Sequence, residues 1–156
     1  MPKTIIRHAT SDDFPVLLEI DTASFPAETA YDSTELAYFM NQTGTETIVL
    51  EHAGSVAAFL IVEVDQARKT GTVVTLDVRA DFRRLGYGSQ LLQKAEEIVT
   101  GNDAWQFRLQ VDVSNAGAIA FYERHGFRPV RKLRHYYADG HDAWLMIKTL
   151  PQGDGK

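Results

Sequence analysis

Residues 83–89 read Arg83-Arg84-Leu85-Gly86-Tyr87-Gly88-Ser89, and they join a segment rich in β-branched residues to an amphipathic segment. The pattern before this turn predicts a strand over Thr72–Arg79, and the pattern after it predicts a helix over Gly88–Thr100. Glycine lets a backbone approach a ligand closely, arginine supplies positive charge, and the N–H groups that begin a helix point outward at the positive end of its dipole. The turn therefore predicts an anion-binding site, with a phosphate-bearing cofactor as its occupant.

Two common phosphate-binding loops do not fit this turn. A P-loop ends in Gly-Lys-Ser or Gly-Lys-Thr, whereas Gly88 is followed by Ser89 and Gln90. A dinucleotide-binding loop would have its third glycine where Leu91 stands. The remaining pattern, Arg-x-x-Gly-x-Gly after a strand, resembles the pyrophosphate loop of the GNAT superfamily of N-acetyltransferases, which use acetyl-coenzyme A. An ordinary strand-to-helix turn could carry the same residues, so a second signature is needed.

That second signature lies in the second half of the chain. Alternation predicts a half-buried strand over Phe107–Val113, and a short helix is expected over Ala116–His125 with Gly126 as its stop. Residues 114–127 read Ser-Asn-Ala-Gly-Ala-Ile-Ala-Phe-Tyr-Glu-Arg-His-Gly-Phe, which resembles the GNAT pattern Asn-x-x-Ala-x-x-x-Tyr-x-x-x-Gly-Phe. The resemblance spans nearly the whole chain, and the chain is most similar to the ribosomal-protein and protein N-terminal (alpha-amino) acetyltransferases.

Composition is typical of a compact soluble enzyme. We expect a single domain over residues 1–150 and a disordered tail over residues 151–156. The chain has no cysteine, which excludes disulfide and thiolate chemistry, and its five histidines lack metal-ligand spacing, so no metal is expected. A net charge of −5 without a basic block argues against nucleic acid as a partner. The absence of a long apolar run predicts no membrane partner and a cytoplasmic location. A monomer or a homodimer is expected.

The order of the elements predicts a mixed sheet flanked by helices. Further strands are expected at Lys3–His8, Thr47–His52, Ser55–Asp65, Arg131–Tyr137 and His141–Thr149. Further helices are expected from Ser11, as the cap, to Phe25-Pro26, and over Ser33–Asn41; hairpin turns are expected at Ala53-Gly54 and Asp139-Gly140. The resemblance implies an α/β (α+β) GNAT fold. Its mixed, mostly antiparallel seven-stranded sheet would carry about four helices and splay between strands 4 and 5.

The resemblance also assigns a coenzyme site. The turn from Arg83 to Ser89 would bind the pyrophosphate, and the backbone of Leu76 and Val78 would bind the pantetheine arm between strands 4 and 5. Asn115 would contact the coenzyme, and Tyr122 would lie near its sulfur as the general acid. The backbone N–H of Val78 would donate to the oxyanion. Without the resemblance, Tyr122 would be interpreted as a core aromatic residue and Asn115 as a helix cap.

The sequence lacks a strong base where the relatives have one. They place Glu or His at the position of Gln110, or Tyr at that of Thr72, and neither Gln nor Thr accepts a proton near neutral pH. Asp77 and Asp112 are expected on the polar faces of their strands, where they would hold an ammonium ion or deprotonate it through water. Solvated surface carboxylates would show the same pattern. At pH 7.5 an α-amine is about a third neutral and a lysine amine only about 0.1%, so a site without a strong base favours an α-amine.

Aromatic residues support the same acceptor. By resemblance to peptide-acetylating enzymes, the acceptor would be bound by Phe25, Pro26, Tyr31, Tyr136 and Tyr137. Only one of the two adjacent tyrosines would face it, because neighbouring strand residues face opposite sides. The expected function is acetyl-coenzyme A dependent N-acetylation of a peptide or protein N-terminus. Two alternatives stay open at this point. One is acetylation of a small amine such as an aminoglycoside, polyamine or amino acid, and the other is a non-catalytic acyl-coenzyme A sensor.

Overall fold

A computed structural model describes residues 3–27, 30–137 and 140–151. Its strands are β1 (Thr4–His8), β2 (Thr45–His52), β3 (Ser55–Asp65), β4 (Thr70–Val78), β5 (Gln106–Asp112), β6 (Arg128–Leu133) and β7 (Ala143–Thr149). Its helices are α1 (Phe14–Ser24), α2 (Ser33–Asn41), α3 (Tyr87–Gly101) and α4 (Ala116–Arg124), with 3-10 turns η1 (Ser11–Asp13) and η2 (Ala80–Phe82). No helix in the described ranges is long and apolar enough to cross a membrane.

The seven strands form a mixed sheet in the order β1-β2-β3-β4-β5-β7-β6. The pairs β1–β2, β2–β3, β5–β7 and β6–β7 are antiparallel, and β4 pairs with β5 in parallel from Thr70↔Gln106 to Val73↔Leu109. The predicted fold class is confirmed, and the splay between strands 4 and 5 stays a prediction. By its contacts the chain divides into two compact units, residues 1–63 with 74–95 and residues 64–73 with 96–156. Each is described by itself below.

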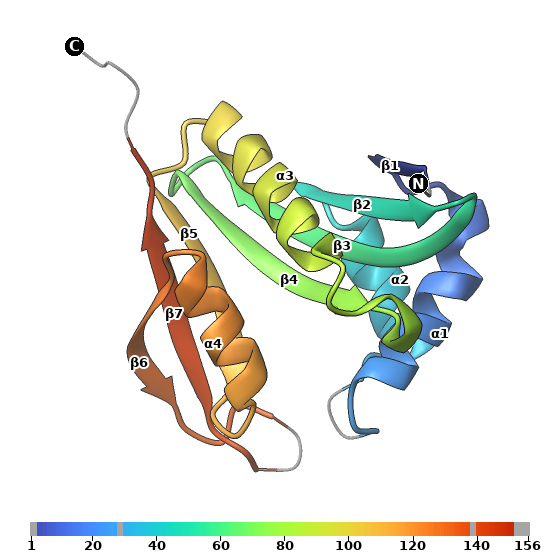
Figure 1. Cartoon of the computed structure of the whole chain (residues 1–156). Helices are drawn as coiled ribbons and strands as arrows, with labels where there is room; N and C mark the ends of the chain where they lie inside the picture. Colours follow the sequence, from blue (N-terminus) through green and yellow to red (C-terminus); the bar gives the residue numbers. More distant parts are fainter. Residues whose placement is uncertain (1–2, 28–29, 138–139, 152–156) are drawn as a thin grey trace. The chain divides into compact units, whose positions relative to one another are not determined.

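In the first unit, helices lie on both faces of the strands. Figure 1 shows α1 and α2 behind β2 and β3, and the first half of α3 in front of them. The core behind the strands joins residues of both helices to inward-facing strand residues, namely Leu17, Ile20, Leu36, Val49, Phe59 and Ile61. β2 turns into β3 through Ala53 (φ 51°) and Gly54 (φ 90°), which confirms the predicted hairpin.

The first helix starts later than the sequence suggested. Ser11 is not the cap of α1, because Ser11–Asp13 forms the 3-10 turn η1, and the Asp13 carboxylate accepts the N–H of Thr10 at 2.7 Å. The α-helix begins at Phe14, with proline in its first turn, where a missing N–H costs nothing. Phe25 ends the helix in an extended conformation, as predicted.

In the second unit, aromatic side chains connect α4 to β5. The rings of Phe107 on β5 and Phe127 after α4 lie 5.3 Å apart, and Tyr122 contacts Phe127 edge-on at 5.7 Å. Gly71 is needed where β4 passes the last turns of α3, since a Cβ there would clash with Val99 Cγ1. β5 alternates as predicted, with its apolar residues buried and its polar residues half-buried.

The last hairpin differs from the predicted one. β6 begins at Arg128 rather than Arg131 and already ends at Leu133, and it is an edge strand with a register shift between Pro129 and Arg131. Edge position and irregular pairing both tolerate proline, which is why the strand includes Pro129. Asp139, expected in the hairpin turn, and residues 152–156 of the expected tail lie outside the described residues.

Candidate active site

The turn between β4 and α3 is exposed and preformed. Arg83, Arg84, Leu85 and Gly86 are all exposed, and both Arg84 (φ 66°) and Gly86 (φ 83°) have a left-handed backbone. Arg83 Nε donates to the carbonyl of Val78 at 3.3 Å, which ties the turn to the end of β4. At the start of α3, Gln90 N–H donates to Gly86 O at 3.0 Å, so the exposed turn leads directly into the helix.

Tyr87 and Gly88 show how the start of α3 is held. Tyr87 is only 7% exposed, so the ring of this predicted coenzyme residue is buried rather than presented to solvent. Its hydroxyl hydrogen-bonds His52 Nδ1, and the His52 ring lies 4.7 Å from Phe82. Gly88 and Ser89 are half-buried in the first helical turn. Sequence reasoning missed His52, which anchors the helix start from β2.

The end of β4 has its faces reversed relative to the prediction. Asp77 is 1% exposed and Thr75 is also buried, whereas Leu76 and Val78 are half-buried. The expectation that Asp77 lies on a polar face is therefore wrong, because the odd-numbered residues of β4 face the protein interior. Thr75 Oγ1 donates to Asp77 Oδ1 at 2.8 Å.

Asp77 meets a second buried acid. Asp21 on α1 is also 1% exposed, and it hydrogen-bonds Asp77 through their side chains. Burial is the main cause that raises the pKa of Asp77 well above its usual range, and the bond to Asp21 and its charge raise it further. Thr75 and the Arg83 charge act in the opposite direction with smaller effect. No sequence pattern pairs Asp21 with Asp77.

The segment after α1 carries three predicted acceptor residues. Phe25 is half-buried and Pro26 is exposed, while residues 28–29 are not described. The Tyr31 ring lies 4.9 Å from Phe39, and its backbone N–H donates to Asp21 Oδ2 at 2.8 Å. The buried acid pair is therefore bonded directly to this segment.

In the second unit, Tyr122 and Asn115 both lie on α4. Tyr122 is 9% exposed, with its ring edge-on to Phe121 at 5.1 Å as well as to Phe127. Asn115 caps the helix, because its side-chain oxygen accepts Ala118 N–H at 3.1 Å. Both structural interpretations weighed from the sequence are thus present. The general acid and the coenzyme contact stay predictions.

Gln110 and Asp112 share the half-buried face of β5, and Asp112 is fully engaged. Its Oδ1 accepts the N–H and the hydroxyl of Ser114, both at 2.8 Å, and its Oδ2 accepts Nδ1 of His141 at 2.8 Å. Partial burial favours the neutral acid, but the bonds from Ser114 and His141 outweigh it and lower the pKa of Asp112. Asp112 is therefore not a freely solvated carboxylate, which was the alternative interpretation weighed from the sequence. His141, which the sequence analysis left aside, becomes a candidate site residue.

Tyr136 and Tyr137 lie in the connection from β6 to β7 and not on a strand. The strand-based argument that they face opposite sides does not apply, since their rings contact each other edge-on at 4.9 Å. Tyr137 N–H donates to His141 O at 3.1 Å, and Tyr136 is 49% exposed. The two tyrosines therefore belong to the same loop as His141.

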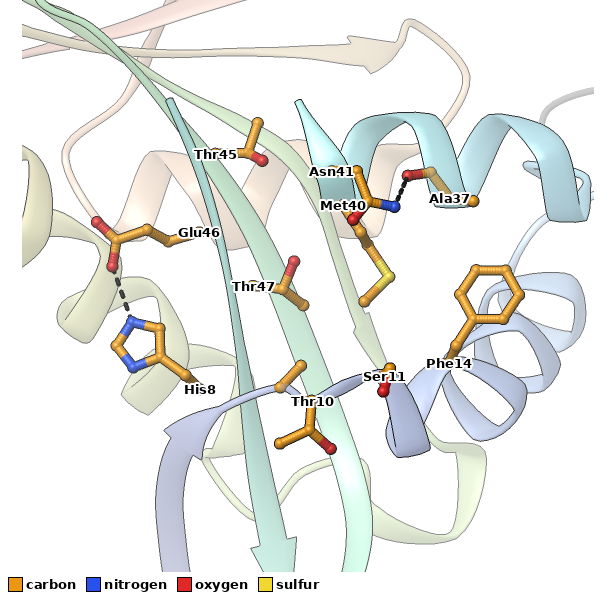
Figure 2. A pocket seen from close by; sticks show the side chains of 11 residues that line it. His8, Thr10, Ser11, Phe14, Ala37, Met40, Asn41, Thr45, Glu46 and Thr47 are labelled. Carbon is orange, nitrogen blue, oxygen red and sulfur yellow. Dashed lines mark hydrogen bonds and ion pairs between the residues drawn. The ribbon is translucent and has the colours of Figure 1, made fainter. Parts of the chain in front are cut away.

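A separate hollow of about 500 Å³ lies elsewhere in the first unit, between the end of β1, η1, α1, α2 and the start of β2. Figure 2 shows the Phe14 ring and the Met40 thioether lining it, together with a pair formed by His8 and Glu46 at 2.8 Å. None of the predicted site residues lines this hollow. Within the described ranges, no three His, Cys, Asp or Glu side chains are grouped so that they could hold a metal ion.

The profile of the Acetyltransferase (GNAT) family matches residues 6–127. An N-alpha-acetyltransferase of Sulfurisphaera tokodaii is 31% identical over 163 aligned positions, gaps included, which cover 93% of this chain and 92% of that protein. The [Ribosomal protein bS18]-alanine N-acetyltransferase of Salmonella typhimurium is 32% identical over 148 residues, 91% and 93% of the two chains. The crystal structure of the ribosomal-protein-S18-alanine N-acetyltransferase from Escherichia coli matches with a TM-score of 0.85 at 26% identity, over 99% of each chain.

These matches define the class of protein as an N-acetyltransferase. The chain belongs to the Acetyltransferase (GNAT) family, whose enzymes use acetyl-coenzyme A. The resemblance inferred from the two sequence signatures is confirmed.

Proposed function

We propose that this protein transfers an acetyl group from acetyl-coenzyme A to the α-amine of a peptide or protein N-terminus. The observation that carries the proposal is the similarity, over more than nine-tenths of the chain, to curated enzymes named for N-alpha and ribosomal-protein alanine acetylation. The family match runs through both compact units, which supports treating residues 1–150 as one acetyltransferase domain.

The turn after β4 fits a pyrophosphate. Its two arginines are exposed, its left-handed residues are preorganised, and the N–H groups of Tyr87 and Gly88 begin a 15-residue helix. An anion is stabilised at such a position by hydrogen bonds and by the helix dipole. We assign the pyrophosphate to Arg83, Arg84 and the backbone up to Ser89, and the pantetheine arm to the backbone of Leu76 and Val78. When bound, acetyl-coenzyme A supplies an acyl group activated as a thioester.

The remaining roles concern protons and charge. The Val78 N–H is assigned to the oxyanion, and the Tyr122 hydroxyl is assigned as the general acid. For the general base we assign His141 with Asp112. His141 Nδ1 lies 2.8 Å from Asp112 Oδ2. A carboxylate can only accept a hydrogen bond, so Nδ1 is the atom that carries the proton and donates it. The neutral imidazole then has Nε2 as its acceptor atom, the form a base requires.

With His141 assigned as the base, the protein needs no basic side chain at the position of Gln110. Gln110 is assigned to acceptor positioning beside Asp112 on the same face of β5. Tyr136, Tyr137, Phe25, Pro26 and Tyr31 are assigned to acceptor binding. The β6–β7 connection then provides both the base and two aromatic rings.

The test is release of coenzyme A from acetyl-coenzyme A with a panel of acceptors. The panel contains short peptides with free α-amines, the same peptides blocked at the α-amine but carrying lysine, and small amines such as polyamines and aminoglycosides. We expect the free α-amines to react fastest, with rates that rise between about pH 6.5 and 8.5 as the amine loses its proton. Activity confined to small amines would establish that alternative. Acyl-coenzyme A binding without turnover would establish the sensor.

A further inference from the structure

The carboxyl groups of Asp21 on α1 and Asp77 on β4 each have one oxygen atom without a hydrogen-bond donor in the described residues. A proton shared between the two carboxyl groups would satisfy both oxygens. Asp77 Oδ1 is bonded to the Thr75 hydroxyl and Asp21 Oδ2 to the Tyr31 N–H. The other two oxygens, Asp21 Oδ1 and Asp77 Oδ2, are buried and have no donor in the described part of the chain. Because the two side chains lie within hydrogen-bonding reach of each other, these oxygens can be satisfied by a hydrogen bond between the two acids. Two carboxyl groups can form that bond only when one of them is protonated.

The surroundings favour keeping this proton. Both acids are 1% exposed, and two buried like charges in contact cannot both ionise at ordinary pH. The charged group that acts on Asp77 from outside the pair is Arg83 on the turn, and its effect is smaller than those of burial and of Asp21. Thr75 on β4 and Tyr31 after α1 contribute neutral donors.

We propose that Asp21 and Asp77 share one proton and act as a positioning pair, which joins the acceptor-binding segment at Tyr31 to the end of β4 beside Val78. The acceptor role rests on the proposed function, because that function places the peptide at Phe25, Pro26 and Tyr31. Because both acids are 1% exposed, we place the pair beneath the binding surface rather than in contact with coenzyme or acceptor. Its effect passes through the Tyr31 N–H and the backbone of β4.

Asparagine provides a selective probe of the shared proton. In Asp77→Asn, the amide oxygen can still accept from Thr75 while the amide N–H donates to Asp21 without any proton in the pair. Asp21→Asn can likewise accept from Tyr31 and donate to Asp77. In the double variant two amide N–H donors or two amide oxygens must face each other, so one of the three hydrogen bonds of the cluster is lost. A shared proton therefore predicts two mild single variants and a disproportionately damaged double variant.

The pH dependence has a definite sign. The folded protein holds the proton more tightly than the unfolded chain, because the folded pKa of Asp77 is raised, so stability falls as the pH rises through that pKa. Loss of the proton breaks the bond between Asp21 and Asp77, so the Tyr31 segment is no longer joined to β4 and KM for the peptide rises. Either single asparagine variant removes this slope, because its N–H donor does not titrate.

The experiment uses the full chain, its two single variants and the double variant, with Asp12→Asn as control because Asp12 is exposed. Carbon NMR of the aspartate carboxyl groups of the native protein, from about pH 5 to about pH 9, measures the shared proton without any activity. We expect one carboxyl of the pair to remain protonated well above the ordinary range. In peptide acetylation, the single variants should raise KM less than about threefold and the double variant about tenfold or more, with smaller changes in kcat.

The outcomes separate the pair from the proposed function. Two fully ionised carboxyl groups at pH 5, or additive effects in the double variant, would overturn the shared proton. A KM that is unchanged in the double variant while its melting temperature falls would overturn the positioning role. If the native protein acetylates no peptide but the NMR result holds, the proposed function and the acceptor role fail together and the shared proton stands.

Discussion

Valine at Gly86 tests whether the turn after β4 binds the coenzyme. Gly86 has φ +83°, and a Cβ built there meets no atom within 4 Å. The substitution therefore meets no steric obstacle, and its cost is conformational, about 1–2 kcal/mol for an L residue in the left-handed region. For a chain of this length the melting temperature should fall by about 2–8 °C.

The coenzyme effect is larger and separable. Acetyl-coenzyme A at 100 times its Kd stabilises the native protein by about 2.7 kcal/mol, which raises the melting temperature by about 5–11 °C. Valine relieves its strain by leaving the left-handed region, and this turns the N–H groups that begin α3 away from the pyrophosphate. We expect the Gly86→Val variant to lose most of the rise produced by acetyl-coenzyme A.

Gly54→Val is the matched control. Gly54 has φ +90° and also has no atom within 4 Å of a built Cβ, but it lies in the β2–β3 hairpin. It should lose a similar amount of stability and keep the coenzyme-induced rise. The assay is thermal unfolding of the three proteins with and without acetyl-coenzyme A. An undiminished rise in Gly86→Val, or an equal loss in Gly54→Val, would refute the assignment of the turn.

Three further variants test the chemistry and the stability. Tyr122→Phe keeps the ring packed on Phe127 and should lower kcat by at least about tenfold at unchanged coenzyme affinity, since general acids contribute about 10²–10⁴-fold. An unchanged kcat would show that Tyr122 is only a core residue. His141→Gln should lower kcat similarly, and Asp112→Asn less, because Asp112 only orients the ring; equal activity of His141→Gln would exclude it as the base. Hydrogen bonding to Arg7 lowers the pKa of Asp13 to about 2, so this pair stabilises the fold above the unfolded pKa near 3.9 and the contribution disappears as the pH falls towards 2. Asp13→Asn should therefore cost on the order of 1–2 kcal/mol in unfolding at pH 7 and less near pH 2, and an equal cost at both values would contradict the ion pair.

Elements with strong local signals could be predicted from the sequence. α2 spans Ser33–Asn41 and β3 spans Ser55–Asp65, both as predicted. Local chemistry explains this agreement, because Asp32 and Glu35 form a capping box at the start of α2 and Gly54 closes the hairpin before β3. The two GNAT signatures fixed the family for the same reason, since each lies within one short stretch of chain.

Features that depend on distant contacts could not be predicted. β4 offers apolar residues on both faces, so its alternation does not show that Asp77 points inward, and only the packing of α1 brings Asp21 to it. His141 and Asp112 are 29 positions apart, and no local pattern marks the histidine. Tyr136 and Tyr137 were expected on a strand because the strand predicted over Arg131–Tyr137 runs past Leu133, where β6 ends.

One measurement tests the central claim most directly. A peptide that carries both a free α-amine and an internal lysine is incubated with the protein and acetyl-coenzyme A near pH 7.5, and fragment-ion mass spectrometry locates the added acetyl group. The account predicts acetylation of the α-amine in large excess over the lysine, because about a third of the α-amine and only about 0.1% of the lysine is neutral at that pH. Acetyl groups found mainly on the lysine, or on neither amine while a small amine is acetylated, would contradict it.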